Sequence, residues 1–232
     1  MEFIHENKYV FEKLKTETID GKRHYVTPNG KYPSVTTVLS YFQKEGIKQW
    51  RERVGKEEAT RVTVRAARRG TQVHLMAEDY LSNKTDFAAR KMPSDVEMFN
   101  TIRGVLDKSI GKIYGLEVPL WSSELRVAGR SDCIAEFDGE LSVVDFKTSN
   151  KYKKREWIDN YFEQGSCYAK MFEERTGQPV NKVVILIAVE NGPYQLFVED
   201  STSYLNSAKE KILHYEKVRE QKRQDLLRDS RE

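Results

Sequence analysis

Cysteine is scarce in this sequence. Cys133 and Cys167 are the only two among 232 residues. Two thiols exclude a disulfide framework, a four-thiolate zinc site and, within one chain, a four-cysteine iron–sulfur cluster. So little cysteine is typical of a protein kept in a reducing compartment, and we therefore expect a cytoplasmic location.

Long apolar segments and a strong net charge are missing as well. The longest apolar run, VVILIAV at 183–189, is far too short to span a bilayer, and the amino-terminal MEFIHENKYV lacks the pattern of a signal peptide. We therefore expect no membrane association. The formal net charge is only +3, so any nucleic-acid site has to come from a local cluster of basic residues.

The residues that are present suit a folded domain, because 38% are hydrophobic and 11% are aromatic. After short strand-like pieces, the pattern predicts helices at 35–42, 47–55, 57–82 and 94–113. Strands are expected at 116–122, 125–137 (with a bulge near Gly129), 141–148, 182–189 and 194–200, with helices at 155–177 and from 202 onward.

This order predicts an α/β (α+β) fold in which helices flank a central mixed β-sheet. We expect one domain over 1–232. It would consist of a mainly helical amino-terminal part at 1–114, a core of sheet and helix at 115–200 and a carboxy-terminal helix at 201–232.

A hairpin in that sheet brings two carboxylates together. Asp138–Gly139 is a strong signal for a two-residue turn, which pairs Phe137 with Glu140 and therefore places Asp132 opposite Asp145. The Cβ atoms of such a pair lie roughly 4.5–5.5 Å apart. Facing carboxylates repel unless a cation lies between them, and oxygen ligands favour Mg²⁺ or Mn²⁺ over zinc. A bulge would shift the register by one residue and remove this pairing.

Lys147 lies two residues after Asp145 and therefore on the same face of its strand. Its ammonium would hold or activate a water near the metal, or stabilise developing negative charge, so the set suits phosphodiester hydrolysis. The alternative is an ordinary solvated hairpin face, which is common in antiparallel sheets. Spacing alone does not decide between the two.

The segment GRSDCIAEFDGELSVVDFKTS at 129–149 resembles the core motif of the PD-(D/E)xK nuclease superfamily, with Ser131 where that motif has a proline. Three further features resemble its RecB-type branch. They are the G-x-x-x-H ending at His74, Glu117 on the preceding strand, and the Q-x-x-x-Y from Gln164 to Tyr168. PSVTTVL at 33–39 and the Thr-Ser after Lys147 resemble the mitochondrial genome maintenance exonucleases and their bacteriophage relatives.

The resemblance implies a restriction-endonuclease-like core and a metal-dependent DNA exonuclease that favours single-stranded ends. It implies catalytic roles for Asp132, Asp145 and Lys147, and DNA binding by Gln164 and Tyr168. It also implies a set of metal ligands: His74, Asp132, Asp145, the backbone carbonyl of Phe146 and, less directly, Glu117.

Each of these residues also has an ordinary structural interpretation. A lone histidine such as His74 on a helix more often makes a structural hydrogen bond. Glu117 would be an edge-strand glutamate, and Tyr168 would be a helix-packing residue.

Basic residues gather in two places. Arg61, Arg65 and Arg68 follow helical spacing, with Arg69 beside them, and Lys151, Lys153 and Lys154 follow the lysine strand. Both groups are candidates for phosphate contacts, and Tyr152 or Trp157 would stack a base. The alternative for the arginines is a solvated helix face paired with Glu57 and Glu58.

Three functional hypotheses follow. The first is a metal-dependent exonuclease acting on single-stranded DNA ends in replication, recombination or repair. The second keeps the chemistry but makes the protein a structure-specific endonuclease. The third is a non-catalytic DNA-binding or recombination scaffold, against which the complete set of His74, Asp132, Asp145 and Lys147 argues.

Overall fold

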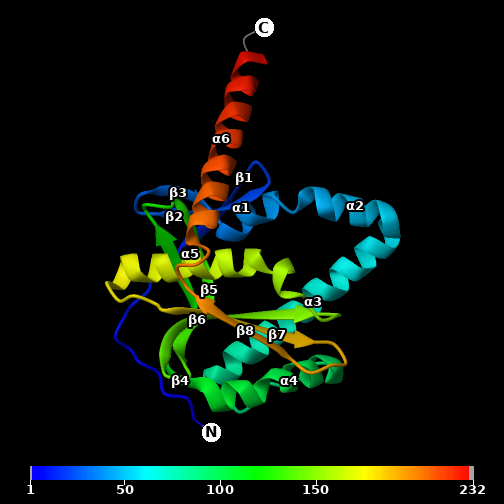
Figure 1. Cartoon of the computed structure of the whole chain (residues 1–232), viewed down its shortest axis with the longest axis vertical. Helices are drawn as coiled ribbons and strands as arrows, with labels where there is room; N and C mark the ends of the chain where they lie inside the picture. Colours follow the sequence, from blue (N-terminus) through cyan, green and yellow to red (C-terminus); the bar gives the residue numbers. More distant parts are fainter. Residues whose placement is uncertain (1, 230–232) are drawn as a thin grey trace.

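A five-stranded mixed sheet forms the centre of the computed structural model, which describes residues 2–229 (Figure 1). The strand order is β4–β5–β6–β7–β8, in which only β6 and β7 run parallel. The strands are β4 (Ile110–Ser122), β5 (Val127–Phe137), β6 (Glu140–Ser149), β7 (Lys182–Val189) and β8 (Gln195–Asp200). The predicted mixed sheet flanked by helices is confirmed.

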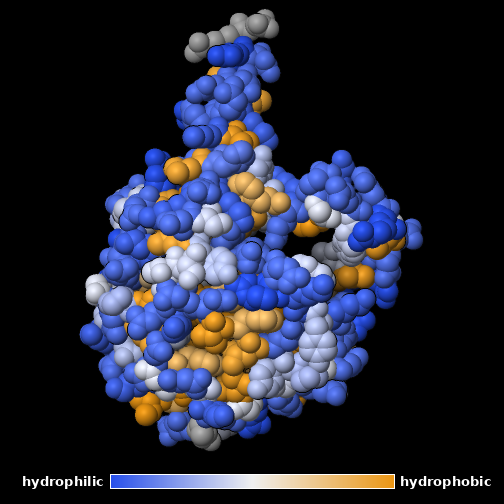
Figure 2. Space-filling model, in the orientation of Figure 1, coloured by the Kyte–Doolittle hydropathy of each residue, from blue (hydrophilic) through white to orange (hydrophobic). Residues whose placement is uncertain are grey.

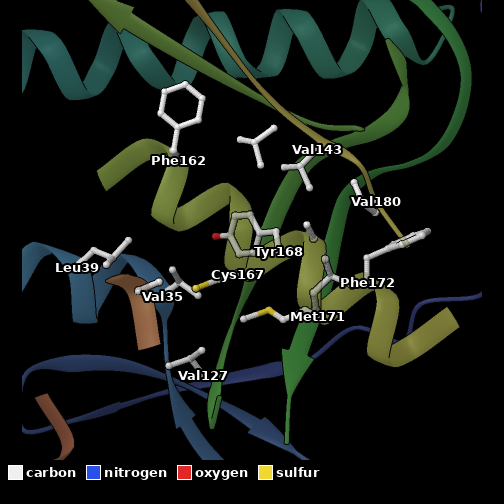
Figure 3. Close-up of a cluster of buried hydrophobic side chains, with 14 of the residues drawn as sticks. Val35, Leu39, Val127, Val143, Phe162, Cys167, Tyr168, Met171, Phe172 and Val180 are labelled. Carbon is white, nitrogen blue, oxygen red and sulfur yellow. The ribbon is translucent and has the colours of Figure 1, made fainter. Parts of the chain in front are cut away.

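The two faces of the sheet bury separate hydrophobic cores. One core lies under α5 (Asp159–Thr176), with α1 (Val35–Tyr41) and α6 (Leu205–Asp229) beside it. Figure 3 shows Phe162 and Phe172 of α5 near Val143 of β6. The other core lies under α3 (Lys56–Leu81) and α4 (Pro93–Ser109), against Val144 and Phe146. Alternate β6 side chains thus enter opposite cores, as a strand buried on both faces requires.

The boundary between α4 and β4 differs from the prediction. The helical pattern predicts a helix as far as residue 113, but α4 ends at Ser109 and β4 begins at Ile110. Ile110 and Ile113 instead pair with Phe137 and Ala135 of β5, and the register shifts on either side of Ile113. The irregularity of this sheet therefore lies in β4, and the bulge predicted near Gly129 is wrong, since Gly129 pairs regularly with Leu120.

The amino-terminal residues form two pieces that the sequence indicated only weakly. A second, antiparallel sheet contains β1 (Lys15–Ile19), β2 (Lys22–Thr27) and β3 (Gly30–Pro33). Residues 3–14, here called the strap, run along the outside of the body (Figure 1). The amide of Ile113 donates to Ile4 O at 2.8 Å, and Phe3 is buried against Tyr80. Long-range contacts therefore hold the strap.

Helix α2 (Lys44–Val54) and the first turns of α3 form an arm that stands away from the body (Figure 1). None of the α2 side chains is buried, and Gly55, with φ of 86°, makes the turn into α3. Figure 2 shows an opening between this arm and the body. Among residues 2–229, no helix is both long and apolar enough to cross a membrane.

Candidate active site

The hairpin prediction is confirmed. Asp138 and Gly139 both have positive φ, 49° and 84°, as a two-residue turn of this kind requires, and Phe137 pairs with Glu140. The pairing of β5 with β6 runs as far as Cys133 and Val144, so Asp132 and Asp145 are the next position in register. There the strands separate, and the backbone amide of Phe146 donates instead to Asp132 Oδ2 at 2.9 Å.

Asp145 is the most deeply buried of the predicted carboxylates. Its side chain is only 2% exposed and forms an ion pair with Lys147. Gln164 donates to its other oxygen at 3.0 Å from one turn of α5. The Tyr168 ring, one turn further, lies against Gly129, where a Cβ atom would come within 2.6 Å of it. Gln164 thus meets a predicted site residue directly, whereas Tyr168 also has the packing role that the alternative assigned to it.

His74, Glu117 and Asp132 converge from α3, β4 and β5. One potential ligand atom from each lies within 4.8 Å of the others. His74 Nδ1 is 3.4 Å from Asp132 Oδ2. Glu117 faces Asp132 in register, because its neighbours Leu116 and Val118 pair with Cys133 and Ser131. One nitrogen and two carboxylate groups at this separation fit a divalent cation such as Mg²⁺ or Mn²⁺.

The other two predicted ligands stand apart from this trio. Asp145 is engaged by Lys147 and Gln164, and it is not among the three residues whose ligand atoms cluster. A metal role for Asp145 and for the carbonyl of Phe146 therefore stays a prediction.

The backbone of Glu117 is unusual for a strand. Its φ is 50°, in the left-handed region that residues other than glycine rarely adopt. Such a conformation costs roughly 1–3 kcal/mol and is found where surrounding structure enforces it, often at functional sites. Here it accompanies a carboxylate that lies next to His74 and Asp132.

We expect Glu117→Gly to leave the metal-free protein at least as stable as the wild type, because glycine adopts this φ without strain. Burial also raises the pKa of Glu117, so its loss removes a desolvated charge. Urea denaturation measures the effect. Glu136→Gly, in neighbouring β5, is the matched control and should lose about 0.5–1 kcal/mol. If the Glu117→Gly protein is less stable than the Glu136→Gly protein, the backbone of Glu117 is not strained.

Electrostatics fix the protonation state of the central residues. Burial, together with the nearby Asp132 charge, raises the pKa of Asp145 to about 6, despite Lys147 beside it. Burial acts to lower the pKa of Lys147, but Asp145 and Asp132 raise it by more. His74 holds the pKa of Asp132 below its usual value although burial opposes this. Lys147 is therefore an ammonium at neutral pH, suited to stabilise negative charge rather than to accept a proton.

His74, Asp132 and Lys147 share one cleft of about 1280 Å³. The cleft is lined by His74, Glu117, Arg130, Asp132, Lys147, Gln164 and Tyr168, and also by residues that the sequence did not point to, among them Tyr9, Phe11 and Lys13 of the strap and Arg23 and Tyr25 of β2. Aromatic and basic residues were visible in the first 25 positions. No local pattern links those positions to β5 and β6, so only the tertiary structure places them here.

The four predicted DNA-binding arginines already have acidic partners. Arg61 pairs with Glu58 at 2.7 Å, and Arg65 and Arg69 both pair with Glu190. Arg68 donates to fully buried Asp95 at 2.7 and 3.2 Å. None of the four lines the cleft. Arg61 and Arg65 are 68% and 57% exposed and remain available to DNA, whereas Arg69 is 4% exposed and buried in its contacts.

The lysines after β6 lie on the loop that leads to a short 3₁₀ helix (Arg155–Trp157). Lys151 and Lys154 are exposed and Lys153 is half-buried. Tyr152 and Trp157 are 52% and 60% exposed, and Lys154 Nζ lies 5.2 Å from the Trp157 ring. This loop therefore presents both charge and aromatic surface to solvent.

Comparisons with known proteins bear on this site. No protein-family model matches the chain. The chain is 27% identical over 175 residues to Mitochondrial genome maintenance exonuclease 1 of Xenopus tropicalis, covering 71% of this chain and 50% of that protein. It is 29% identical over 129 residues to the protein of the same name from Mus musculus, covering 52% and 38%. The matched part thus spans about half the length of the Xenopus tropicalis protein and less of the Mus musculus protein.

Among solved structures, one from Eubacterium rectale named "Putative exonuclease" superposes with a TM-score of 0.45 at 14% identity, covering 62% of this chain and 63% of that one. The likeness to bacteriophage proteins stays a prediction. The resemblance drawn from the motifs is confirmed: the chain is similar in sequence to the proteins named Mitochondrial genome maintenance exonuclease 1.

Proposed function

We propose that this protein is a metal-dependent DNA exonuclease that hydrolyses phosphodiester bonds at single-stranded ends. One observation carries the proposal: His74, Glu117 and Asp132 bring their ligand atoms within 4.8 Å of one another, in the same cleft as Lys147. Four separate elements supply these side chains. A solvated hairpin face, the alternative for the carboxylates, does not account for a histidine from α3 and a glutamate from β4 at the same point.

His74, Glu117 and Asp132 would hold Mg²⁺ or Mn²⁺, with Asp145 and the Phe146 carbonyl as further proposed ligands. A bound ion of this kind lowers the pKa of a water and neutralises charge on a phosphoryl oxygen. Gln164 holds the Asp145 carboxylate in place through its hydrogen bond. The Lys147 ammonium, held by Asp145, stabilises the negative charge that develops on the phosphate.

The surroundings of the site support a single-stranded substrate. Aromatic side chains of the strap, Tyr9 and Phe11, line the cleft. Exposed Tyr152 lies on the lysine-bearing loop after β6, and exposed Trp157 ends the short 3₁₀ helix that follows this loop. Stacking of unpaired bases on such side chains, beside basic groups that contact the backbone, is typical of single-strand binding. The opening under the arm of α2 and α3 (Figure 2) suits a single strand that enters by its end.

The direct test uses end-labelled single strands incubated with purified protein and Mg²⁺, Mn²⁺ or EDTA. Stepwise shortening that needs the divalent cation is the expected result, and no metal-dependent degradation refutes the nuclease and favours the scaffold hypothesis. A closed circular single strand distinguishes the exonuclease from the remaining alternative, the endonuclease. An exonuclease leaves the circle intact, so its cleavage would favour the endonuclease.

A second prediction concerns the exposed arginines of α3. We expect Arg61→Ala with Arg65→Ala to weaken single-strand binding and to lower the slope of log affinity against log salt by about 1.4, that is about 0.7 for each lost phosphate contact. Titration of a labelled oligonucleotide at several salt concentrations measures the slope. The matched control is Arg219→Ala with Arg223→Ala on α6, where Arg223 pairs with Glu220 as Arg61 does with Glu58. Equal slopes in the wild type and both double variants would show that Arg61 and Arg65 do not contact the DNA.

A cytoplasmic location and a role in replication, recombination or repair remain part of this proposal. The relatives are named for maintenance of the mitochondrial genome, which describes those proteins.

A further inference from the structure

Each carboxylate of the site has its own basic partner. Asp145 pairs with Lys147, Asp132 with His74, and Glu117 with Arg130. The three basic side chains differ in exposure: those of Lys147 and His74 are 20% and 31% exposed, whereas that of Arg130 is 62% exposed. Arg130 is therefore the partner with most freedom to leave.

The position of Arg130 follows from the pairing of β4 with β5. Its backbone pairs with Pro119, two residues beyond Glu117, and it shares a strand face with Asp132. The guanidinium reaches across to Glu117 and lies in the same cleft as His74 and Asp132. It thus binds a carboxylate that a divalent cation at His74, Glu117 and Asp132 would also need.

We propose that Arg130 is an exchangeable counter-ion that neutralises Glu117 until a divalent cation binds, and then turns to a phosphate of the DNA. The inference rests on the proposed metal site. Arginine stays charged at any working pH, so a bound cation repels it from Glu117. A freed guanidinium binds phosphate through paired hydrogen bonds, and its exposure in the cleft makes it reachable. Metal and DNA then strengthen each other's binding through one side chain.

The first measurement is Mn²⁺ binding without DNA, followed by electron paramagnetic resonance of the free ion. Arg130→Ala should bind Mn²⁺ about two- to fivefold more tightly than the wild type, since the cation no longer competes with an ion pair of partly exposed groups. Arg126→Ala is the matched control. Arg126 is 66% exposed and pairs with Glu216, and it does not line the cleft. Its Mn²⁺ affinity should equal that of the wild type.

The second measurement is single-strand binding with Ca²⁺ or with EDTA at equal ionic strength, on an oligonucleotide shown by gel to remain intact. Ca²⁺ should raise the affinity of the wild type and of Arg126→Ala for DNA. In Arg130→Ala this gain should fall by about two- to fivefold, while the affinity in EDTA changes little, because Glu117 already holds the guanidinium there.

A variant that merely misfolds binds both Mn²⁺ and DNA more weakly. Tighter Mn²⁺ binding together with a smaller Ca²⁺-dependent gain in DNA affinity therefore identifies the exchange. Unchanged or weaker Mn²⁺ binding in Arg130→Ala, with normal binding in the wild type, overturns the exchange and leaves the metal site standing. An undiminished Ca²⁺ gain in Arg130→Ala overturns it too. No Mn²⁺ binding by the wild type overturns the metal site and the exchange together.

Discussion

Lys147→Ala should reduce metal-dependent cleavage by at least about 100-fold and leave single-strand binding within a few-fold of the wild type. Removing one preorganised group that stabilises developing charge typically costs 10²- to 10³-fold in rate. Lys147 qualifies because Asp145 and Asp132 keep its pKa raised against the effect of burial, so the charge is present throughout the reaction. Single-turnover cleavage of an end-labelled strand and an equilibrium titration measure the two effects.

The control for this prediction is Lys209→Ala. Lys209 also forms an ion pair, with Glu124 at 2.7 Å, but it lies outside the cleft. Because Lys147→Ala leaves buried Asp145 without its cation, circular dichroism and retained DNA binding must show that the variant folds. Cleavage by folded Lys147→Ala at the rate of Lys209→Ala contradicts the assigned role.

Asp132→Asn should abolish both cleavage and the stabilisation that Mn²⁺ confers. Asp132 is central to the cluster, because it faces Glu117, contacts His74 and accepts from the Phe146 amide. Asparagine keeps the shape and the acceptor for that amide but loses the charge. At a Mn²⁺ concentration about 100 times its Kd, a bound ion adds about 2.7 kcal/mol, which raises the Tm of a protein of this size by roughly 5–10 °C. The variant should show none of this increase.

Asp79→Asn is the matched control, since Asp79 lies on α3, as His74 does, but pairs with Lys84 and does not line the cleft. Its Tm should rise with Mn²⁺ as the wild type does. A full Mn²⁺-induced rise in Asp132→Asn would exclude Asp132 as a ligand.

The same stabilisation should depend on pH. Burial acts to lower the pKa of His74, but the charge and hydrogen bond of Asp132 raise it by more, so the pKa lies above its usual 6.5. Only neutral imidazole binds a metal, and protons therefore compete with Mn²⁺. The Tm increase should shrink as the pH falls, and the loss should begin above pH 6.5.

Local chemistry made the hairpin predictable. Asp138–Gly139 predicts a two-residue turn, and that turn length fixes every pair from Phe137 to Cys133. The neighbouring positions of Asp132 and Asp145 could therefore be predicted by counting residues from the turn. The family motifs added His74 and Gln164, which no turn or periodicity brings to β6. The placement of these two residues at the site was predicted from the family resemblance and not from the pattern of the sequence.

Long-range pairing was not predictable. The helical spacing of Arg61, Arg65 and Arg68 is the same for a DNA-binding face and for a face that pairs with acids. Asp95, which Arg68 contacts, lies 27 residues further along the chain. Arg130 was equally hidden, because its partner Glu117 belongs to another strand whose register depends on irregularities in β4. Such contacts arise from packing between elements, which a single sequence does not encode locally.

The arm of α2 bears on the difference between an exonuclease and an endonuclease. A helix without buried side chains, joined to α3 through Gly55, loses little when it separates from the body, so its local opening requires far less free energy than global unfolding. A strand that passed through the opening beside the arm would have to enter by its end. If the arm opened, a strand without an end would be able to enter from the side. For the proposed exonuclease, a preference for DNA ends would then depend on how long the arm stays shut, and so on the local stability of α2 as well as on the residues of the site.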